Sequence, residues 1–362
     1  MSNLRHNWTK AEILDIYNKP LMDLLYEAAS VHRTHHEPNT VQVSTLISIK
    51  TGGCPEDCGY CPQAARYHTN IEGNDLMSVS QVKAQALRAK SSGSSRVCMG
   101  AAWRNVKDGP EFDQVLEMVR TINKLDMEVC CTLGMITENQ ALRLAEAGLY
   151  AYNHNLDTSE DYYKDVISTR AFQDRLDTIA NVRKSNVTVC SGGIIGMGED
   201  LEDRAGMLVA LATLNPQPES VPINALVAVK GTPMEAMEPI AIWDMIRMVA
   251  TTRIVMPQTQ VRLSAGRNEM TREGQALCFF AGANSIFAGD KLLTTPNPDV
   301  NEDMAMFKLL GLVPQKPFVK MAQPETVEAK DTAHNALGEK PKWSRPSHSI
   351  ERNEMANDKS RR

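Results

Sequence analysis

Three cysteines on one short segment are the clearest chemical signal in the sequence. Cys54, Cys58 and Cys61 form a CxxxCxxC run directly after an apolar, β-branched stretch. Three thiolates on one loop can bind a single metal centre. A structural zinc site needs four ligands, and His68 could complete one, whereas a four-iron cluster held by three cysteines keeps one iron open for a substrate or cofactor. The segment therefore predicts a metal site, and an open iron would make it a site of chemistry.

Three further cysteines and one arginine lie at corresponding places farther along the chain. Cys98, Cys130 and Cys190 fall on the second, third and fifth expected strands, at their ends, and Arg262 falls on the seventh. In a closed parallel barrel, alternate residues of each strand point inward, so side chains from non-adjacent strands can meet in one interior layer. One cysteine alone would indicate a core position, because free cysteine is among the most buried residue types. Three of them with an arginine indicate a second site.

The remaining two cysteines are expected to serve packing. Cys131 follows Cys130 directly, so its side chain should point to the opposite face of the strand. Cys278 lies in an apolar segment that is predicted to be helical. Arg262 is an unusual metal ligand, because arginine stays protonated in nearly every setting. Its residue type alone favours an anion-binding or ion-pair role.

Polar side chains alternate along the fourth expected strand. Asn153, Asn155 and Asp157 are two residues apart, so their side chains share a face while the strand lasts. Such groups are costly to bury without hydrogen-bonding partners, so they suit a polar ligand at a barrel mouth. His154 should point the other way and be structural. Arg175 fits either a place near the ligand or a solvated position on its helix.

These residues need a scaffold that brings strand ends together. Short β-branched runs alternate with amphipathic helical stretches over about 280 residues, which predicts an α/β fold, a (β/α)8 TIM-type barrel, over residues 41–318. The expected strands are Val41–Ile49, Arg96–Met99, Glu128–Cys131, Ala151–Asn155, Thr188–Cys190, Val221–Asn224, Gln260–Leu263 and Ser285–Phe287. The expected helices between them are 80–90, 112–124, 138–147, 171–184, 201–214 and 240–255. A doubly wound open sheet would require a phosphate-binding glycine fingerprint after the first strand, which is missing.

The two ends of the chain differ from this pattern. Residues 1–40 are predicted to form an N-terminal helical extension, in which Thr9 and Glu12 have capping-box spacing and Pro20 separates two short helices. From 319 to 362 the only aromatic residue is Trp343 and the charge is mixed, which predicts a polar, disordered tail.

Composition sets the class of protein. Of the 362 residues 42% are hydrophobic, enough to fill a large core, and the net charge of −5 argues against a broad nucleic-acid surface. No apolar run approaches the roughly 20 residues of a membrane span, and the start does not resemble a secretory signal. A cytoplasmic, reducing location is expected, so the eight cysteines need a purpose other than disulfides.

The cysteine motif, with Tyr60 before its last cysteine, resembles the signature of the radical S-adenosylmethionine enzymes. The segment Gly192–Glu199 (GGIIGMGE) also matches the GxIxGxxE pattern of that superfamily after the fifth strand. The resemblance implies that Cys54, Cys58 and Cys61 hold a [4Fe–4S] cluster whose fourth iron binds S-adenosylmethionine. Electron transfer would then cleave this cofactor to a 5′-deoxyadenosyl radical.

From about residue 10 to 318 the chain further resembles the biotin synthase family. The likeness is carried by Arg96–Trp103, Tyr152–Thr158, Val189–Gly193, Val221–Asn224 and Val261–Arg267. It implies a [2Fe–2S] cluster inside the barrel, with the ligands Cys98, Cys130, Cys190 and Arg262. It assigns to S-adenosyl-L-methionine the residues Tyr60, Asn155, Asp157, Arg175 and Ile194, and to dethiobiotin the residues Asn153 and Asn224.

The same resemblance implies the reaction and its partners. Sulfur from the [2Fe–2S] cluster is inserted into dethiobiotin to form biotin, and two S-adenosylmethionine molecules are used per turnover. No side chain is expected to be catalytic, because the cofactor generates the radical. A barrel sealed by the N-terminal helices and the loops would exclude water. A flavodoxin-type electron donor, iron–sulfur assembly proteins and a homodimer are implied, with no nucleic-acid or membrane partner.

Two other functions stay open at this point. A radical S-adenosylmethionine enzyme with a different small-molecule substrate would keep the cysteine loop but would not need the second set of ligands. A non-catalytic iron–sulfur carrier or scaffold would need neither a large barrel nor the polar residues of the fourth strand.

Overall fold

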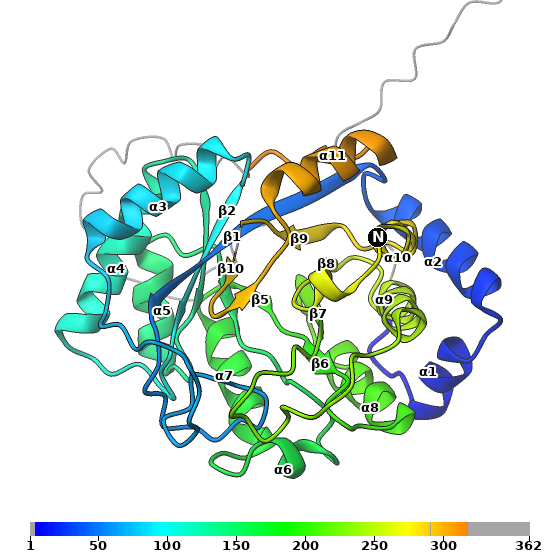
Figure 1. The fold of residues 1–362 in the computed structure, drawn as a ribbon, viewed down its shortest axis with the longest axis horizontal. Helices are drawn as coiled ribbons and strands as arrows, with labels where there is room; N and C mark the ends of the chain where they lie inside the picture. The colour runs from blue at the N-terminus through cyan, green and yellow to red at the C-terminus, as the bar shows by residue number, and fades with distance from the viewer. Residues whose placement is uncertain (1–3, 290, 318–362) are drawn as a thin grey trace, which may run out of the picture. The chain divides into compact units, whose positions relative to one another are not determined.

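The computed structural model describes residues 4–289 and 291–317. The tail predicted for 319–362 lies outside the described residues. At the centre is a parallel sheet in which each strand pairs with the next, and in which the first strand also pairs with the last. This pairing closes the sheet into a barrel, so the predicted TIM-type fold is confirmed (Figure 1). Its strands are β1 (Thr40–Lys50), β2 (Arg96–Ala101), β3 (Glu128–Thr132), β4 (Ala151–Asn153), β5 (Thr188–Cys190), β6 (Gly193–Ile195), β7 (Ser220–Ala225), β8 (Gln260–Leu263) and β9 (Ser285–Phe287).

The fifth place in the barrel is shared by two short strands. Both β5 and β6 pair with β7, the first through Cys190 and Ser220, the second through Gly193–Ile195. The break between them falls at Ser191 and Gly192. The chain therefore turns at the barrel wall where the sequence carries its glycine-rich segment.

Helices form the outer layer because each buries one apolar stripe against the strands. In α4, for example, Phe112, Val115 and Val119 recur at three- and four-residue steps and are fully buried. Figure 1 shows the helices in chain order around the strands. They are α3 (Val79–Ser91), α4 (Pro110–Asn123), α5 (Glu138–Glu146), α6 (Tyr163–Val166), α7 (Phe172–Lys184), α8 (Leu201–Ala212), α9 (Ile242–Val255), α10 (Arg272–Phe280) and α11 (Val300–Leu310). A 3₁₀ turn, η1 (Arg267–Glu269), precedes α10.

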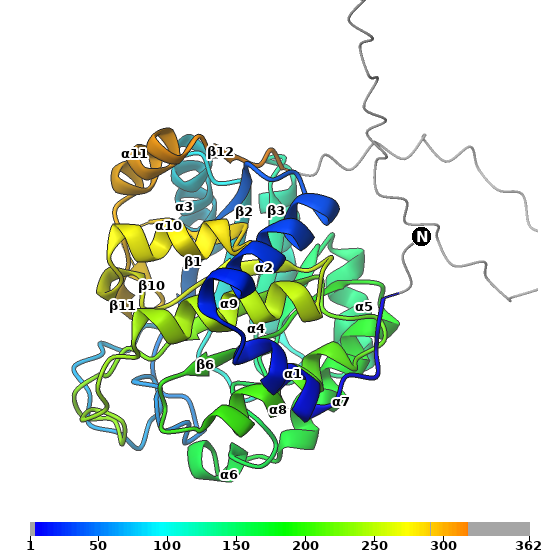
Figure 2. The same ribbon diagram turned by 90° about the vertical axis from the view of Figure 1, so that its right-hand side faces the viewer.

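The helical extension before the barrel is confirmed. Thr9 and Glu12 form the expected capping box at the start of α1 (Lys10–Tyr17), and Pro20 directly precedes α2 (Leu21–His35). The first helix packs on α8 and α9, and the second runs along α9, as Figure 2 shows. No helix among the described residues is long and apolar enough to cross a membrane.

Three short strands were not expected from the sequence. The hairpin β10 (Lys291–Leu292) and β11 (Thr295–Pro296) follows β9, and β12 (Val313–Pro314) pairs with the start of β1. The hairpin enters the barrel mouth, since a Cβ atom added at Gly100 of β2 would lie 2.6 Å from the Leu293 side chain. Gly100 therefore makes room for the hairpin tip.

Candidate functional site

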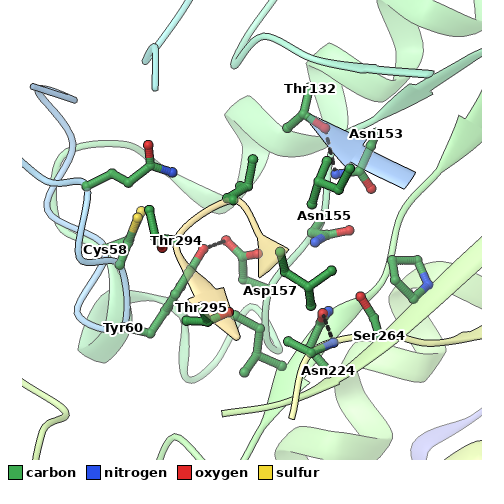
Figure 3. A pocket seen from close by; sticks show the side chains of 18 of the residues that line it. Cys58, Tyr60, Thr132, Asn153, Asn155, Asp157, Asn224, Ser264, Thr294 and Thr295 are labelled. Atoms are coloured by element: carbon green, nitrogen blue, oxygen red, sulfur yellow. Dashed lines mark hydrogen bonds between the residues drawn. The ribbon is translucent and has the colours of Figure 1, made fainter. Parts of the chain in front are cut away.

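A cavity of about 330 Å³ opens inside the barrel. The cysteine loop, the inward faces of the strands and the β10–β11 hairpin line it, and Figure 3 shows several of these side chains facing one another. The helices α1 and α2 contribute no residue to the lining of this cavity, so their sealing of the barrel stays a prediction. Leu292 and Leu293 of the hairpin line the cavity.

The three loop cysteines all line this cavity. Backbone hydrogen bonds shape the loop, since the Cys54 N–H donates to the Gln63 carbonyl over 3.0 Å and the Cys61 N–H to the Cys58 carbonyl over 2.9 Å. Burial raises the pKa of Cys58 to about 11 and that of Cys61 to about 12. These thiols therefore carry protons at neutral pH until a metal displaces them.

The zinc alternative does not fit this geometry. Among the described residues, no three histidine, cysteine or acidic side chains converge as they would on one ion. His68 is exposed and does not line the cavity. The donor set of three thiols around an open space instead suits a larger iron–sulfur cluster with one iron open.

Two acidic residues inside the motif anchor the loop, which the sequence analysis missed. The Asp57 carboxylate accepts backbone hydrogen bonds from Ser168 (2.9 Å) and Thr169 (3.1 Å). Burial would raise the pKa of Asp57, but the hydroxyl hydrogen bonds from Ser168 and Thr169, followed by these backbone ones, hold it at about 2. Glu56, which is 2% exposed, lies 3.4 Å from the Arg170 Nε atom. Their partners lie more than 100 residues away in sequence, so no local pattern could have identified them.

The second set of predicted ligands also comes together inside the barrel. Cys98 and Cys130 are register partners on the neighbouring strands β2 and β3, and the Arg262 Nη1 atom lies 3.8 Å from the Cys190 sulfur. Cys98 and Cys130 lie within their strands and not at strand ends, which corrects the expected placement. All four side chains are buried.

Electrostatics favours a thiolate at this inner set. The side-chain hydrogen bond from Cys130 is the largest cause that lowers the pKa of Cys98, to about 7, and the Arg262 and Arg96 charges add to it against burial. The same hydrogen bond and burial raise the pKa of Cys130. Soft thiolates with a nitrogen ligand fit a cluster of the [2Fe–2S] type.

The two cysteines assigned to packing behave as expected. Cys131 belongs to the apolar layer between strands and helices, whereas Cys98 and Cys130 belong to a small inner cluster. Cys278 is fully buried in α10.

Asp157 is the centre of a buried polar cluster beside the cysteine loop. Its Oδ2 atom accepts a 2.9 Å hydrogen bond from the Tyr60 hydroxyl and pairs with the Arg175 guanidinium (Figure 3 shows the first contact). The Arg175 Nε atom also donates to the Tyr163 hydroxyl over 2.9 Å. Arg175 is 5% exposed, so a solvated position for it is wrong.

The glycine-rich segment holds Asp157 in an uncommon backbone conformation, with φ +69°. The Ile194 N–H donates to the Asp157 carbonyl over 2.8 Å. A Cβ at Gly193 would lie 2.6 Å from that same oxygen, and one at Gly192 would lie 2.0 Å from the Pro222 carbonyl, which explains both glycines. Ile194 itself lines the cavity.

The glutamate that ends this motif is structural. The Glu199 carboxylate accepts hydrogen bonds from the N–H groups of Gly196 (2.8 Å) and Met197 (2.7 Å) and from Arg204 (2.8 Å). It therefore closes the turn into α8 and does not reach the cavity.

Three asparagines line the cavity with Asp157. The strand β4 ends at Asn153, so strand alternation does not extend to Asn155 as expected. Asn153 donates to the Thr132 hydroxyl over 3.2 Å, and the Asn155 Oδ1 atom accepts from the Gly192 N–H over 3.2 Å.

The third asparagine, Asn224, lies on β7. It donates to the Gly193 carbonyl over 2.9 Å and accepts from the Ala265 N–H over 3.1 Å. Each amide still has further hydrogen-bonding capacity.

His154 packs beside the buried aromatic ring of Tyr152. Its ring centroid is 6.5 Å from that of Tyr152, and the Nε2 atom has no partner among the described residues. Burial, with the charges of Arg175 and Arg170, lowers its pKa well below the usual value, so the ring is neutral. It also borders the cavity. Its structural role stays a prediction.

The hairpin adds two lining residues that the sequence did not indicate, Thr294 and Thr295. Asn297 fixes the returning chain by donating to the carbonyls of Phe287 (3.0 Å) and Gly289 (2.9 Å). The segment is short and has no repeating pattern, so its place in the cavity depends on contacts made after the barrel has formed.

Comparison with known proteins identifies two family models in the chain. Residues 48–211 match the Radical SAM superfamily, and residues 222–313 match the Biotin and Thiamin Synthesis associated domain. The first region contains the cysteine loop, and the second contains Asn224, Arg262 and the hairpin.

Close relatives carry one name. The chain is 85% identical to a biotin synthase of Flavobacterium psychrophilum over 353 residues, which are 98% of each chain. It is 81% identical to a biotin synthase of Christiangramia forsetii, over 97% of this chain and 96% of the relative.

Solved structures with low sequence identity share the fold. Methylornithine synthase (PylB) matches with a TM-score of 0.71 at 18% identity, over 85% of this chain and 94% of its own. The FeFe-hydrogenase maturase HydG from Carboxydothermus hydrogenoformans matches with a TM-score of 0.72 at 15% identity, over 85% of this chain and 76% of its own.

Proposed function

Because the chain belongs to the biotin synthase family within the radical S-adenosylmethionine superfamily, we propose that its barrel cavity is where sulfur is inserted into dethiobiotin to form biotin. One observation carries this proposal. The loop cysteines and three of the four inner ligands (Cys98, Cys130 and Arg262) line a single cavity, together with amide and carboxylate side chains. Two reactive centres and a polar substrate can therefore meet in one enclosed space.

The residues of the loop side would hold the radical source. Cys54, Cys58 and Cys61 would bind a [4Fe–4S] cluster, which supplies the electron that cleaves S-adenosylmethionine. Tyr60, Ile194, Asn155 and Arg175 surround the space beside it. The described contacts of Asp157 from Tyr60 and Arg175 both use Oδ2, so Oδ1 can accept a hydrogen bond from a ribose hydroxyl. The buried Arg175 side chain pairs with Oδ2 and so fixes the orientation of that carboxylate.

The inner set would hold the sulfur source. Cys98, Cys130, Cys190 and Arg262 would bind a [2Fe–2S] cluster, the proposed sulfur donor, with two S-adenosylmethionine molecules used per turnover. Asn153 and Asn224 line the same cavity as the two cysteine sets and offer both donors and acceptors. These match the carbonyl and N–H groups of a ureido ring.

The rest of the chain excludes water and positions these groups. The hairpin residues Leu292 and Leu293 contribute to the apolar lining of the cavity. The proposal also includes a flavodoxin-type electron donor, iron–sulfur assembly proteins, a homodimer and a cytoplasmic location.

Anaerobic turnover with dethiobiotin, in which biotin and 5′-deoxyadenosine are both measured, tests this function. Mössbauer spectra before and after one turnover should show two cluster types and loss of the [2Fe–2S] signal. Formation of 5′-deoxyadenosine without biotin would instead indicate a radical enzyme with another substrate. Clusters without any 5′-deoxyadenosine would indicate a carrier or scaffold.

A further inference from the structure

The Arg262 guanidinium presents only one of its three nitrogens to the inner cysteines. Its Nε atom donates to the Ser285 hydroxyl over 2.9 Å, and Nη2 donates to the Gln42 Oε1 atom over 3.0 Å and, at the longer distance of 3.4 Å, to the Ser44 hydroxyl. Nη1 is the nitrogen that lies 3.8 Å from the Cys190 sulfur. The guanidinium carbon lies 4.6 Å from the centre of the Phe287 ring, which limits rotation of the group. Its partners therefore select the nitrogen that faces the cluster site.

Gln42 stands between this arginine and a buried carboxylate. It lies on β1, is 3% exposed, and its Nε2 atom donates to the Glu128 Oε2 atom over 3.5 Å. Its Oε1 atom accepts from Arg262 and, over 3.2 Å, from the Ser285 hydroxyl. Glu128 in turn binds Arg96 through contacts of 2.8 Å and 2.7 Å. The chain of contacts runs from Arg96 to Arg262 with one neutral amide in the middle.

This order of groups has an electrostatic consequence. A buried carboxylate attracts any guanidinium within reach, because screening inside the barrel is weak. The amide satisfies both charged neighbours, donating to Glu128 and accepting from Arg262. Glu128 then stays paired with Arg96, and Arg262 stays directed toward the sulfurs.

We propose that Gln42 is a positioning residue that holds Arg262 in place as the fourth ligand of the inner cluster. The proposal rests on the function above, since it needs a cluster at the inner set. Residues that orient a metal ligand typically change metal affinity 10- to 100-fold when they are replaced. Gln42→Met keeps the length of the side chain but removes its three hydrogen bonds, with Glu128, Arg262 and Ser285.

The test follows the inner cluster by visible circular dichroism and by its rate of loss to an iron chelator. We expect an altered [2Fe–2S] spectrum and about 10- to 100-fold faster loss in Gln42→Met, with an unchanged [4Fe–4S] spectrum. Because Gln42 acts through Arg262, adding Gln42→Met to Arg262→Met should change nothing further. Gln260→Met is the matched control, because Gln260 lies on the same strand as Arg262 and its Oε1 atom has no partner among the described residues.

Other outcomes would overturn the proposal. A wild-type spectrum and release rate in Gln42→Met would do so, and so would additive effects in the double variant, which indicate a general packing role. If Gln42→Met does not fold, Gln42→Leu decides, since it also removes the side-chain hydrogen bonds to Arg262 and Glu128 and should give the same spectral change. A wild-type protein that binds only one cluster would overturn the proposed function as well.

Discussion

At the scale of single residues, the two cysteine sets differ in their electrostatics. Burial is the largest cause that raises the pKa of Cys58 and Cys61 in the loop, and the charges of Arg175 and Arg170 offset it only in part at Cys58. At the inner set, the hydrogen bond from Cys130 and then the charges of Arg262 and Arg96 lower the pKa of Cys98, whereas the pKa values of Cys130 and Cys190 are raised. One inner cysteine is therefore favourable for negative charge before any metal binds, whereas the loop thiols must gain their stabilisation from the metal itself.

Cys58→Ala should abolish S-adenosylmethionine cleavage. The side chain is one of only three thiols on the loop, and two cysteines cannot hold the predicted cluster. Activity should fall at least 1,000-fold, roughly the loss expected when a needed cofactor is missing. The measurement is 5′-deoxyadenosine formed anaerobically with a chemical reductant. Cys278→Ala, which removes a core thiol outside both sets, should retain most of it. Substantial 5′-deoxyadenosine from Cys58→Ala would refute the assignment.

Asn153→Ser should weaken the use of dethiobiotin and leave both clusters assembled. The shorter side chain cannot span from Thr132 to the cavity, so a hydrogen bond to the substrate worth about 1–2 kcal/mol is lost. This predicts a KM for dethiobiotin about 5- to 30-fold higher. Iron content and visible spectra give the control. Loss of either cluster in this variant would show that Asn153 belongs to a metal site instead.

At the scale of elements, the sequence correctly predicted the strands and helix ends that local sequence patterns determine. All eight expected strands occur, most within two residues of the expected ends, because β-branched runs and helical periodicity are local signals. The capping box at Thr9 is equally local. The anchoring of Asp57 by Ser168 and Thr169 and the packing of Leu293 near Gly100 join residues more than 100 positions apart, and the ion pair of Arg175 with Asp157 joins two elements 18 residues apart. No spacing rule reaches them.

The packing of α2 on the barrel predicts a pH dependence of stability. His32 is 4% exposed and stacks on His36 with ring centres 5.3 Å apart. Burial, then the charges of Arg253 and Arg33, lowers its pKa from 6.5 to about 4. The unfolded chain therefore binds a proton at pH 5 that the folded chain does not, so stability falls as pH drops from about 6.5 toward 4.

Urea unfolding of the metal-free protein at pH 7 and pH 5 measures this effect. His32 should account for about 2 kcal/mol of the decrease, and His32→Gln should remove that share. His68→Gln, at an exposed site, should leave the wild-type difference in place. An equal pH dependence in wild type and His32→Gln would contradict the prediction.

At the scale of the whole molecule, the cavity depends on two segments that are far apart in the sequence of the barrel. The cysteine loop follows the first strand, whereas the hairpin follows the last, and the two meet because β1 pairs with β9. The segment after β9 is in turn tied back by a fully buried ion pair. Asp303 of α11 binds Arg267, which also donates to the Phe287 carbonyl at the end of β9 over 3.0 Å. The contacts that close the barrel at β1 and β9 therefore also hold in place the segments that line the cavity.

Asp303→Ala should consequently destabilise the entire barrel. The substitution leaves the Arg267 charge buried without its carboxylate, which costs about 3–5 kcal/mol. The melting temperature should fall by about 10 °C, and Glu302→Ala, one residue earlier on the exposed side of α11, should melt like the wild type. Because the penalty comes from the unpaired charge, Arg267→Met combined with Asp303→Leu should recover part of the loss. If Asp303→Ala has the same melting temperature as Glu302→Ala, or if the double variant melts at a lower temperature than Asp303→Ala, the ion pair does not hold the end of the barrel in place.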